Sequence, residues 1–263
     1  MILSSIDQQT AIREVAMQFN RRSFVLGASA MMATSRAFGQ SGSGSPRSIY
    51  DEINKWTTDP QNSAYFDPPN EPEMKGSLVL APSNQAVIAA AKLLASVPTN
   101  LPPIGIVKYM IKNFPDPNKM EWPKDTPGHR KPANPVIIAF FAATATKPTQ
   151  GDQTAWCAAL VCWALQHAGL PQPHNAASAK FRSWDGTTKT DDPQKGDLIV
   201  FKSVSDPAHG HVTFFDGFVD SKKTAVWCVG GNQSDAINRK SFSLHSKSLE
   251  LDGFRTATGY RMA

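Results

Sequence analysis

The sequence has 263 residues, of which 41% are hydrophobic and 19% are charged, with a formal net charge of +5. This composition is typical of globular proteins, and no apolar run is long enough for a stable membrane anchor. The basic residues are scattered and the net charge is small, which argues against a nucleic-acid-binding protein.

The first segment of the chain has the pattern of an export signal. Arg21 and Arg22 precede a mildly apolar run to Ala33, and Ala37–Gly39 has the small-x-small pattern of a cleavage site. This predicts a twin-arginine signal over residues 1–39, recognised by the twin-arginine export machinery. The alternative is a short amphipathic helix. Export would place the mature protein in the periplasm or outside the cell, where three cysteines, an odd number, leave at least one free thiol or an intermolecular bridge.

Residues 40–133 are predicted to form a linker followed by a Pro-rich, partly helical accessory region. Ser41–Pro46 is a Gly/Ser linker. Within Asn84–Ser96, apolar residues recur at helical spacing and Pro98 ends the pattern, whereas the prolines of Pro115–Pro132 prevent long regular elements. The sequence leaves three roles open for this region: a flank of the substrate site, a wall-binding module, or packing for the next domain.

A second domain is predicted over residues 134–263. Asn134 and Pro135 are favourable at the N-cap and first position of a helix that runs to Phe141. Strands are expected further on, at Leu198–Phe201, at His211–Phe215 with a break at Asp216–Gly217, and at Thr224–Val229. Helices followed by an antiparallel sheet indicate an α+β domain.

The stretch Asp152–Leu170 predicts a buried helix that carries a cysteine in its first turn. Thr154 is the expected N-cap, and Gly169 the expected stop. Cys157 would then meet the unpaired N–H groups and positive end of the helix, which favour a reactive thiolate of lowered pKa. The plain alternative is a small core residue, and that is our interpretation of Cys162.

A cysteine nucleophile needs a base and a group that orients the base. His211 opens a predicted strand and can take the thiol proton, although His209 would share its face and spacing alone does not separate the two. The side-chain oxygen of Asn232, after Gly230-Gly231, can accept the second imidazole N–H, but a Gly-Asn turn is also common. His-x-His without a carboxylate set is weak support for zinc, so we expect no metal and no cofactor.

Four ordered motifs resemble the CHAP-like cysteine amidohydrolase/peptidase family, which is related to NlpC-type cell-wall peptidases and phage endolysin modules. They are Thr154–Val161, Gly196–Phe201, Gly210–Val212 and Gly230–Asp235. The resemblance covers about residues 134–261 and implies a papain-like fold, in which the cysteine helix packs on an antiparallel sheet that bears the histidine. It implies Cys157 as nucleophile, His211 as base and Asn232 as orienting residue. The chain departs from the family pattern at Ala155, where the family has Pro, and at Thr213, where Gly is common.

The resemblance and the export signal together predict a hydrolase that cleaves an amide bond in peptidoglycan or its stem peptides through a thioester. It would act as an N-acetylmuramoyl-L-alanine amidase or a stem-peptide endopeptidase. The Cys157 N–H and Gln153 would form the oxyanion hole, and Trp156 and Trp184 would line the substrate groove or pack in the core. The alternatives are a non-catalytic wall-binding or partner-binding module of the same fold, and an acyltransferase or transpeptidase that uses the same thioester.

Overall fold

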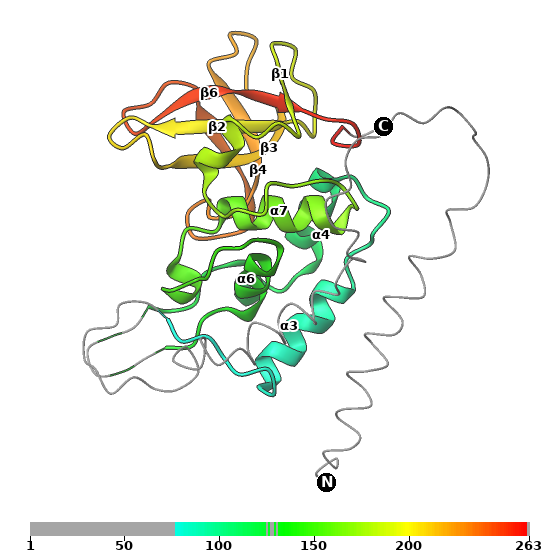
Figure 1. Cartoon of the computed structure of the whole chain (residues 1–263), viewed down its shortest axis with the longest axis vertical. Coiled ribbons are helices and arrows are strands. Elements are labelled where there is room, and N and C mark those ends of the chain that lie inside the picture. The colour runs from blue at the N-terminus through cyan, green and yellow to red at the C-terminus, as the bar shows by residue number, and fades with distance from the viewer. Residues whose placement is uncertain (1–76, 125, 127–128, 130, 262–263) are drawn as a thin grey trace, which may run out of the picture.

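The computed structural model describes residues 77–124, 126, 129 and 131–261. The predicted export signal, the Gly/Ser linker and the start of the accessory region lie outside the described residues. In the described part, helix α7 (Cys157–His167) lies between an antiparallel sheet and the other helices (Figure 1). This arrangement confirms the prediction of an α+β fold with an antiparallel sheet.

Within the described residues, four α-helices precede α7, and their ends follow the local sequence. The helix predicted within Asn84–Ser96 is α3 (Gln85–Ala95), and the Asn84 side chain caps it by accepting from the Ala86 N–H. The Asn134 side chain caps α6 (Pro135–Phe140) in the same way. The others are α4 (Pro103–Asn113) and α5 (Asp116–Lys119).

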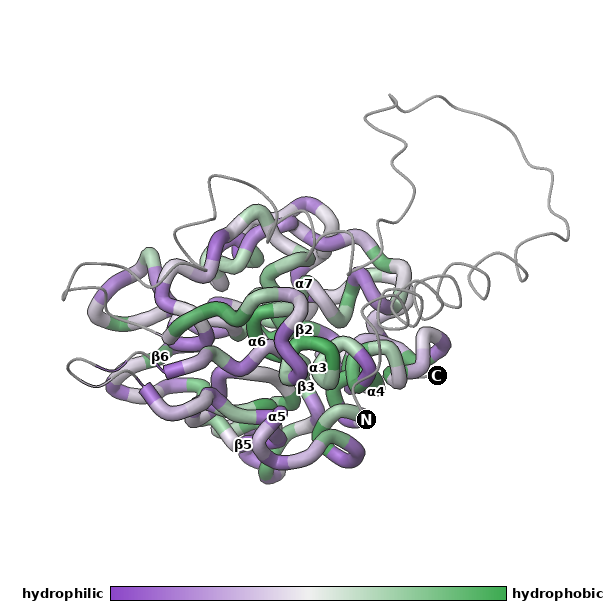
Figure 2. The backbone as a smooth tube through the Cα atoms, turned by 90° about the horizontal axis from the view of Figure 1, so that it is seen from below, coloured by the Kyte–Doolittle hydropathy of each residue, from purple (hydrophilic) through white to green (hydrophobic). Residues whose placement is uncertain are grey.

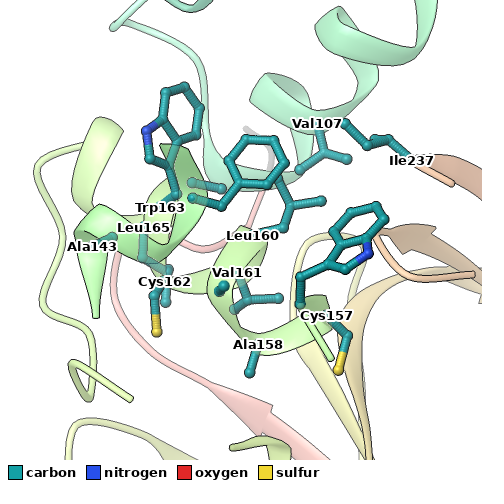
Figure 3. Packing of buried hydrophobic residues seen from close by; sticks show 14 of the residues in the cluster. Val107, Ala143, Cys157, Ala158, Leu160, Val161, Cys162, Trp163, Leu165 and Ile237 are labelled. Atoms are coloured by element: carbon teal, nitrogen blue, oxygen red, sulfur yellow. The ribbon is translucent and has the colours of Figure 1, made fainter. Parts of the chain in front are cut away.

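Helix α7 is buried on nearly all sides because it has neighbours above and below. Its residues Cys157–Leu165 are all buried. Leu160 faces Val107 of α4, with Ile237 nearby (Figure 3), and these residues belong to one hydrophobic cluster. Gly169, at φ +72°, ends the helix as predicted. The described part of the predicted accessory region, from Ser77 onward, therefore packs into the same core as the cysteine helix.

The described residues form a six-stranded antiparallel sheet in the order β1-β6-β2-β3-β4-β5. The strands are β1 (Thr188–Thr190), β2 (Leu198–Ser203), β3 (Gly210–Phe218), β4 (Ala225–Gly230), β5 (Asn238–Ser243) and β6 (Leu249–Thr256). One face, with Val212 and Phe214, joins the α7 cluster, and the opposite face, with Phe215, builds a second cluster. The most hydrophobic stretches include α3 and α6 (Figure 2).

The predicted break at Asp216–Gly217 is wrong, because β3 continues to Phe218. The pair sits in an irregularity of the β3–β4 pairing between Phe215 and Phe218, where Gly217 adopts φ +121°. The bulge directs the Asp216 carboxylate toward Lys108 of α4 at 2.5 Å and Arg239 of β5 at 2.6 Å. A turn signal in the sequence is thus a bulge that ties α4 to the sheet.

None of the helices in the described residues has the length and apolar content needed to cross a membrane.

Candidate active site

Cys157 is the first residue of α7, as the sequence predicts for the nucleophile. Cys157 is only 5% exposed. The backbone N–H groups of Cys157 and Ala158 lie at the open end of the helix, and both act toward lowering the pKa of the thiol. The sulfur points away from the Leu160 cluster (Figure 3). The thiol therefore sits at the helix start with backbone donors around it.

Thr154 does not cap this helix, contrary to the prediction. The N-cap is Trp156, which makes no side-chain cap, and the Thr154 hydroxyl accepts instead from the Gln150 N–H at 3.0 Å. Thr154 instead ends the preceding 3₁₀ turn at Gly151–Gln153 as its C-cap, and α7 begins only at Cys157.

The buried Asp152 carboxylate fixes the approach to this helix. One oxygen accepts from the backbone N–H groups of Trp122 and Asn134, at 2.9 and 2.8 Å. The other accepts from the Ser77 hydroxyl and from Gln153 Nε2, the latter at 3.1 Å. Four donors satisfy a carboxylate that is otherwise costly to bury. Asp152 thereby anchors the turn before Cys157 to three earlier segments of the chain.

The structure brings Cys157 against the strand that bears His211. Strand β4 pairs with β3 only from Phe214 onward, so the backbone of residues 211–213 is unpaired on that side. The backbone of Val212 lies close enough to the Cys157 sulfur there to act toward lowering the pKa of the thiol. The competing His209 is an exposed loop residue that pairs with Asp206 at 3.3 Å. Burial and position thus separate the two histidines, which spacing alone could not do.

His211 is buried and held by two neighbours. Its ring stacks on Phe242 with centroids 5.2 Å apart and planes 20° apart, and its Nε2 lies 3.2 Å from Gln233 Oε1. The Gln233 amide nitrogen donates to the Asn238 backbone oxygen at 3.0 Å and to Asn238 Oδ1 at 2.9 Å, which fixes its oxygen toward the imidazole. An amide oxygen only accepts, so Nε2 of His211 carries the proton. The lone pair on Nδ1 is left free to accept a proton.

Gln233, rather than Asn232, contacts the imidazole. The side chain of Asn232 is half-buried and makes no hydrogen bond to the described residues. Asn232 adopts φ +56°, and Ser234 and Asp235 also have positive φ. The path of this turn decides which side chain faces His211, and the sequence does not reveal it. The one available signal was a second amide directly after the predicted Asn.

Two glycines make this turn possible. A Cβ on Gly230 would collide with the Thr213 hydroxyl, and one on Gly231 would collide with the Trp156 ring. The turn therefore crosses closely between the strand of His211 and the start of α7.

Burial sets the protonation of both reactive groups. It raises the pKa of the Cys157 thiol, against the effect of the N–H groups of Val212, Ala158 and Cys157 itself. The expected lowering by the helix end is therefore wrong, because desolvation outweighs the backbone donors. Burial, with a smaller contribution from the charge of Lys240, lowers the pKa of His211 to about 4, and the hydrogen bond that the imidazole donates to Gln233 opposes this shift. At neutral pH the pair rests as a thiol and a neutral imidazole.

The other predicted site residues, Gln153, Trp156 and Trp184, lie in different surroundings. Gln153 donates to Asp152, and its buried Oε1 has no hydrogen-bond partner. Trp156 is fully buried, with its Nε1 donating to Glu121 at 3.0 Å and its ring stacked on Phe140, so it belongs to the core rather than to a groove. Trp184 is half-buried and packs edge-on against Phe181.

No metal centre is present in the described part of the chain, where no three His, Cys, Asp or Glu side chains gather to hold an ion. An apolar cavity of about 140 Å³ lies between α3, α6 and residues 144–148. None of the predicted site residues lines it.

Comparison with protein families identifies the segment that holds this pair. Residues 149–232 match the family model of the CHAP domain. The CHAP match, which confirms the resemblance seen in the sequence, contains Cys157 and His211 and ends at Asn232, one residue before Gln233. A search of curated proteins and a search of solved structures found no match.

Proposed function

We propose that this protein is a cysteine hydrolase that cleaves an amide bond in peptidoglycan. The CHAP match supports hydrolysis of peptidoglycan in general. The observation that carries the chemistry is the placement of the Cys157 thiol, at the start of α7, against the backbone of β3. The same strand bears His211, whose Nε2 is held by the Gln233 amide oxygen so that Nδ1 is free. The packing of α7 on the sheet that bears His211 supports a papain-like arrangement.

The first half of the reaction begins from the neutral pair. As the Cys157 sulfur attacks the amide carbon, its proton passes to Nδ1 of His211, because the thiol is not ionised beforehand. The imidazolium then gives this proton to the leaving amine nitrogen as the C–N bond breaks, and a thioester remains on Cys157. Gln233 Oε1 holds the ring throughout, and its bond to Nε2–H strengthens when the ring becomes positive.

The second half of the reaction hydrolyses the thioester and regenerates the free enzyme. A water molecule loses its proton to His211 and attacks the thioester carbon, and the proton returns to the sulfur as the acid product leaves. The Cys157 N–H at the helix start is the proposed donor to the oxyanion in both halves. Gln153 is the proposed second donor through the remaining hydrogen of its amide nitrogen, whose other contact is Asp152.

The compartment and the specific bond are further parts of the proposal. The twin-arginine pattern in residues 1–39 supports export to the periplasm or the cell exterior, where peptidoglycan is accessible. The bond is either the N-acetylmuramoyl-L-alanine amide or an amide within the stem peptide.

Digestion of purified sacculi tests this function and names the bond. Wild type and Cys157→Ala are incubated with sacculi under reducing conditions, and mass spectrometry identifies the released fragments and their new amine termini. We expect release by the wild type alone. An added amine that captures the acyl group in place of water would indicate an acyltransferase, and no release by either protein would favour a binding module.

A further inference from the structure

The imidazole of His211 has a cationic neighbour that the reaction itself does not use. Lys240 and Phe242 are two residues apart on β5 and therefore point to the same face of the strand. The Lys240 ammonium lies 5.9 Å from the centroid of the Phe242 ring, and this ring stacks on His211. Lys240 is thus linked to the base through one shared ring.

A second contact places the same ammonium on the turn that holds the base. Lys240 Nζ donates to the Ser234 hydroxyl at 2.5 Å, and Ser234 directly follows Gln233. Two independent contacts therefore hold the cation beside His211. The charge of Lys240 acts on His211, because it contributes to lowering the pKa of the imidazole.

The charge of Lys240 has no anionic partner among the described residues. Its one hydrogen bond goes to a neutral hydroxyl, whereas Lys108 and Lys202 each pair with a carboxylate. A cation beside a base opposes the imidazolium that forms during the reaction. An anionic group of the substrate at Lys240 would remove this opposition, so that binding and proton transfer would favour each other.

We infer that Lys240 binds a carboxylate of the substrate beside the amide that is cleaved. This inference rests on the proposed function and adds its substrate class, a peptide that carries a free carboxylate close to the scissile bond. Lys240 is exposed and the Phe242 ring beside it is half-buried, so the ammonium can be reached by a substrate carboxylate and the charge pair stays largely solvated.

The test compares two substrates that differ in this group alone. Soluble stem peptides containing the bond cut in sacculi are prepared with free carboxylates and, in parallel, with the carboxylates converted to carboxamides. The wild type should have a kcat/KM about 2- to 5-fold higher for the free acid, as expected for an exposed charge pair. Lys240→Gln should bring the ratio of the two kcat/KM values close to one, and Lys240→Glu should invert it.

Lys223 supplies a matched control. It is an exposed lysine whose ammonium also lies over a phenylalanine, 5.0 Å from the Phe218 centroid. Lys223→Gln removes the same charge and should keep the wild-type ratio. The inference is overturned if the wild type does not distinguish the substrates or if Lys240→Gln keeps the wild-type ratio. It is also overturned if Lys240→Gln and Lys223→Gln lower the ratio equally. Failure of the wild type to cleave either peptide or sacculi would instead contradict the proposed function.

Discussion

Removing the Gln233 side chain tests whether this residue orients the base. Gln233→Ala deletes the oxygen that lies 3.2 Å from His211 Nε2. A hydrogen bond from a charged donor contributes about 1.5–3 kcal/mol, and this one becomes charged when His211 takes the thiol proton. Since about 1.4 kcal/mol corresponds to a tenfold change, kcat/KM should fall about 10- to 100-fold.

The same substitution also affects stability, so the assay must separate the two effects. It leaves the Asn238 backbone oxygen without its 3.0 Å partner, at a cost of about 1–3 kcal/mol. Kinetics on a soluble peptide are therefore measured well below the melting temperature of the variant. Gln233→Glu gives a second measurement: a carboxylate beside the imidazole raises its pKa, so the acid limb of kcat/KM should move to higher pH.

Asn232→Gly is the control, because glycine accepts the positive φ of this position and the Asn side chain makes no hydrogen bond to the described residues. It should change kcat/KM less than about threefold. Loss of activity in Asn232→Gly, with activity retained in Gln233→Ala, would refute our assignment and restore the role that the sequence predicts for Asn232.

Three further predictions concern pH and buried charge. The pKa of His211 is about 4 in the fold, against about 6.5 when unfolded. The unfolded chain therefore binds more protons between these values, and up to about 3 kcal/mol of stability should disappear from pH 6.5 to 4 in urea titrations of wild type but not of His211→Gln. Asp152→Asn presents an amide group to four donors and should lower the free energy of unfolding by about 3 kcal/mol. Asp185 is exposed, so Asp185→Asn should change the free energy of unfolding by less than about 0.5 kcal/mol in the same titrations. Asp216→Asn breaks the pair with Lys108 and should cost about 1–3 kcal/mol; an unchanged melting temperature would show that this link does not stabilise the fold.

Local patterns were sufficient for the helix bounds and for placing Cys157 at a helix start and His211 on a strand. The helical spacing of α3, the Asn134 cap of α6 and the Gly169 stop are set by neighbouring residues, so the sequence predicts them. The alternation in β3 likewise places His211 on a strand. These features depend on contacts within a few residues.

Other features depend on contacts that the sequence does not display. Strands β5 and β6 were not predicted, because β5 is mostly exposed and polar and β6 contains Asp252-Gly253 in its middle. The pKa of Cys157 depends on how deeply tertiary packing buries it, which reverses the effect expected from the helix end. The choice between Asn232 and Gln233 depends on the backbone of one turn.

Acid quenching of the protein during turnover tests the central claim most directly. Wild type is mixed with a soluble stem peptide, quenched in acid at short times, and mapped by mass spectrometry. The account predicts that a fraction of the chain gains the mass of the acyl fragment on Cys157, and that Cys157→Ala gains none and releases no product. An adduct on another residue, or product release by Cys157→Ala, would contradict it.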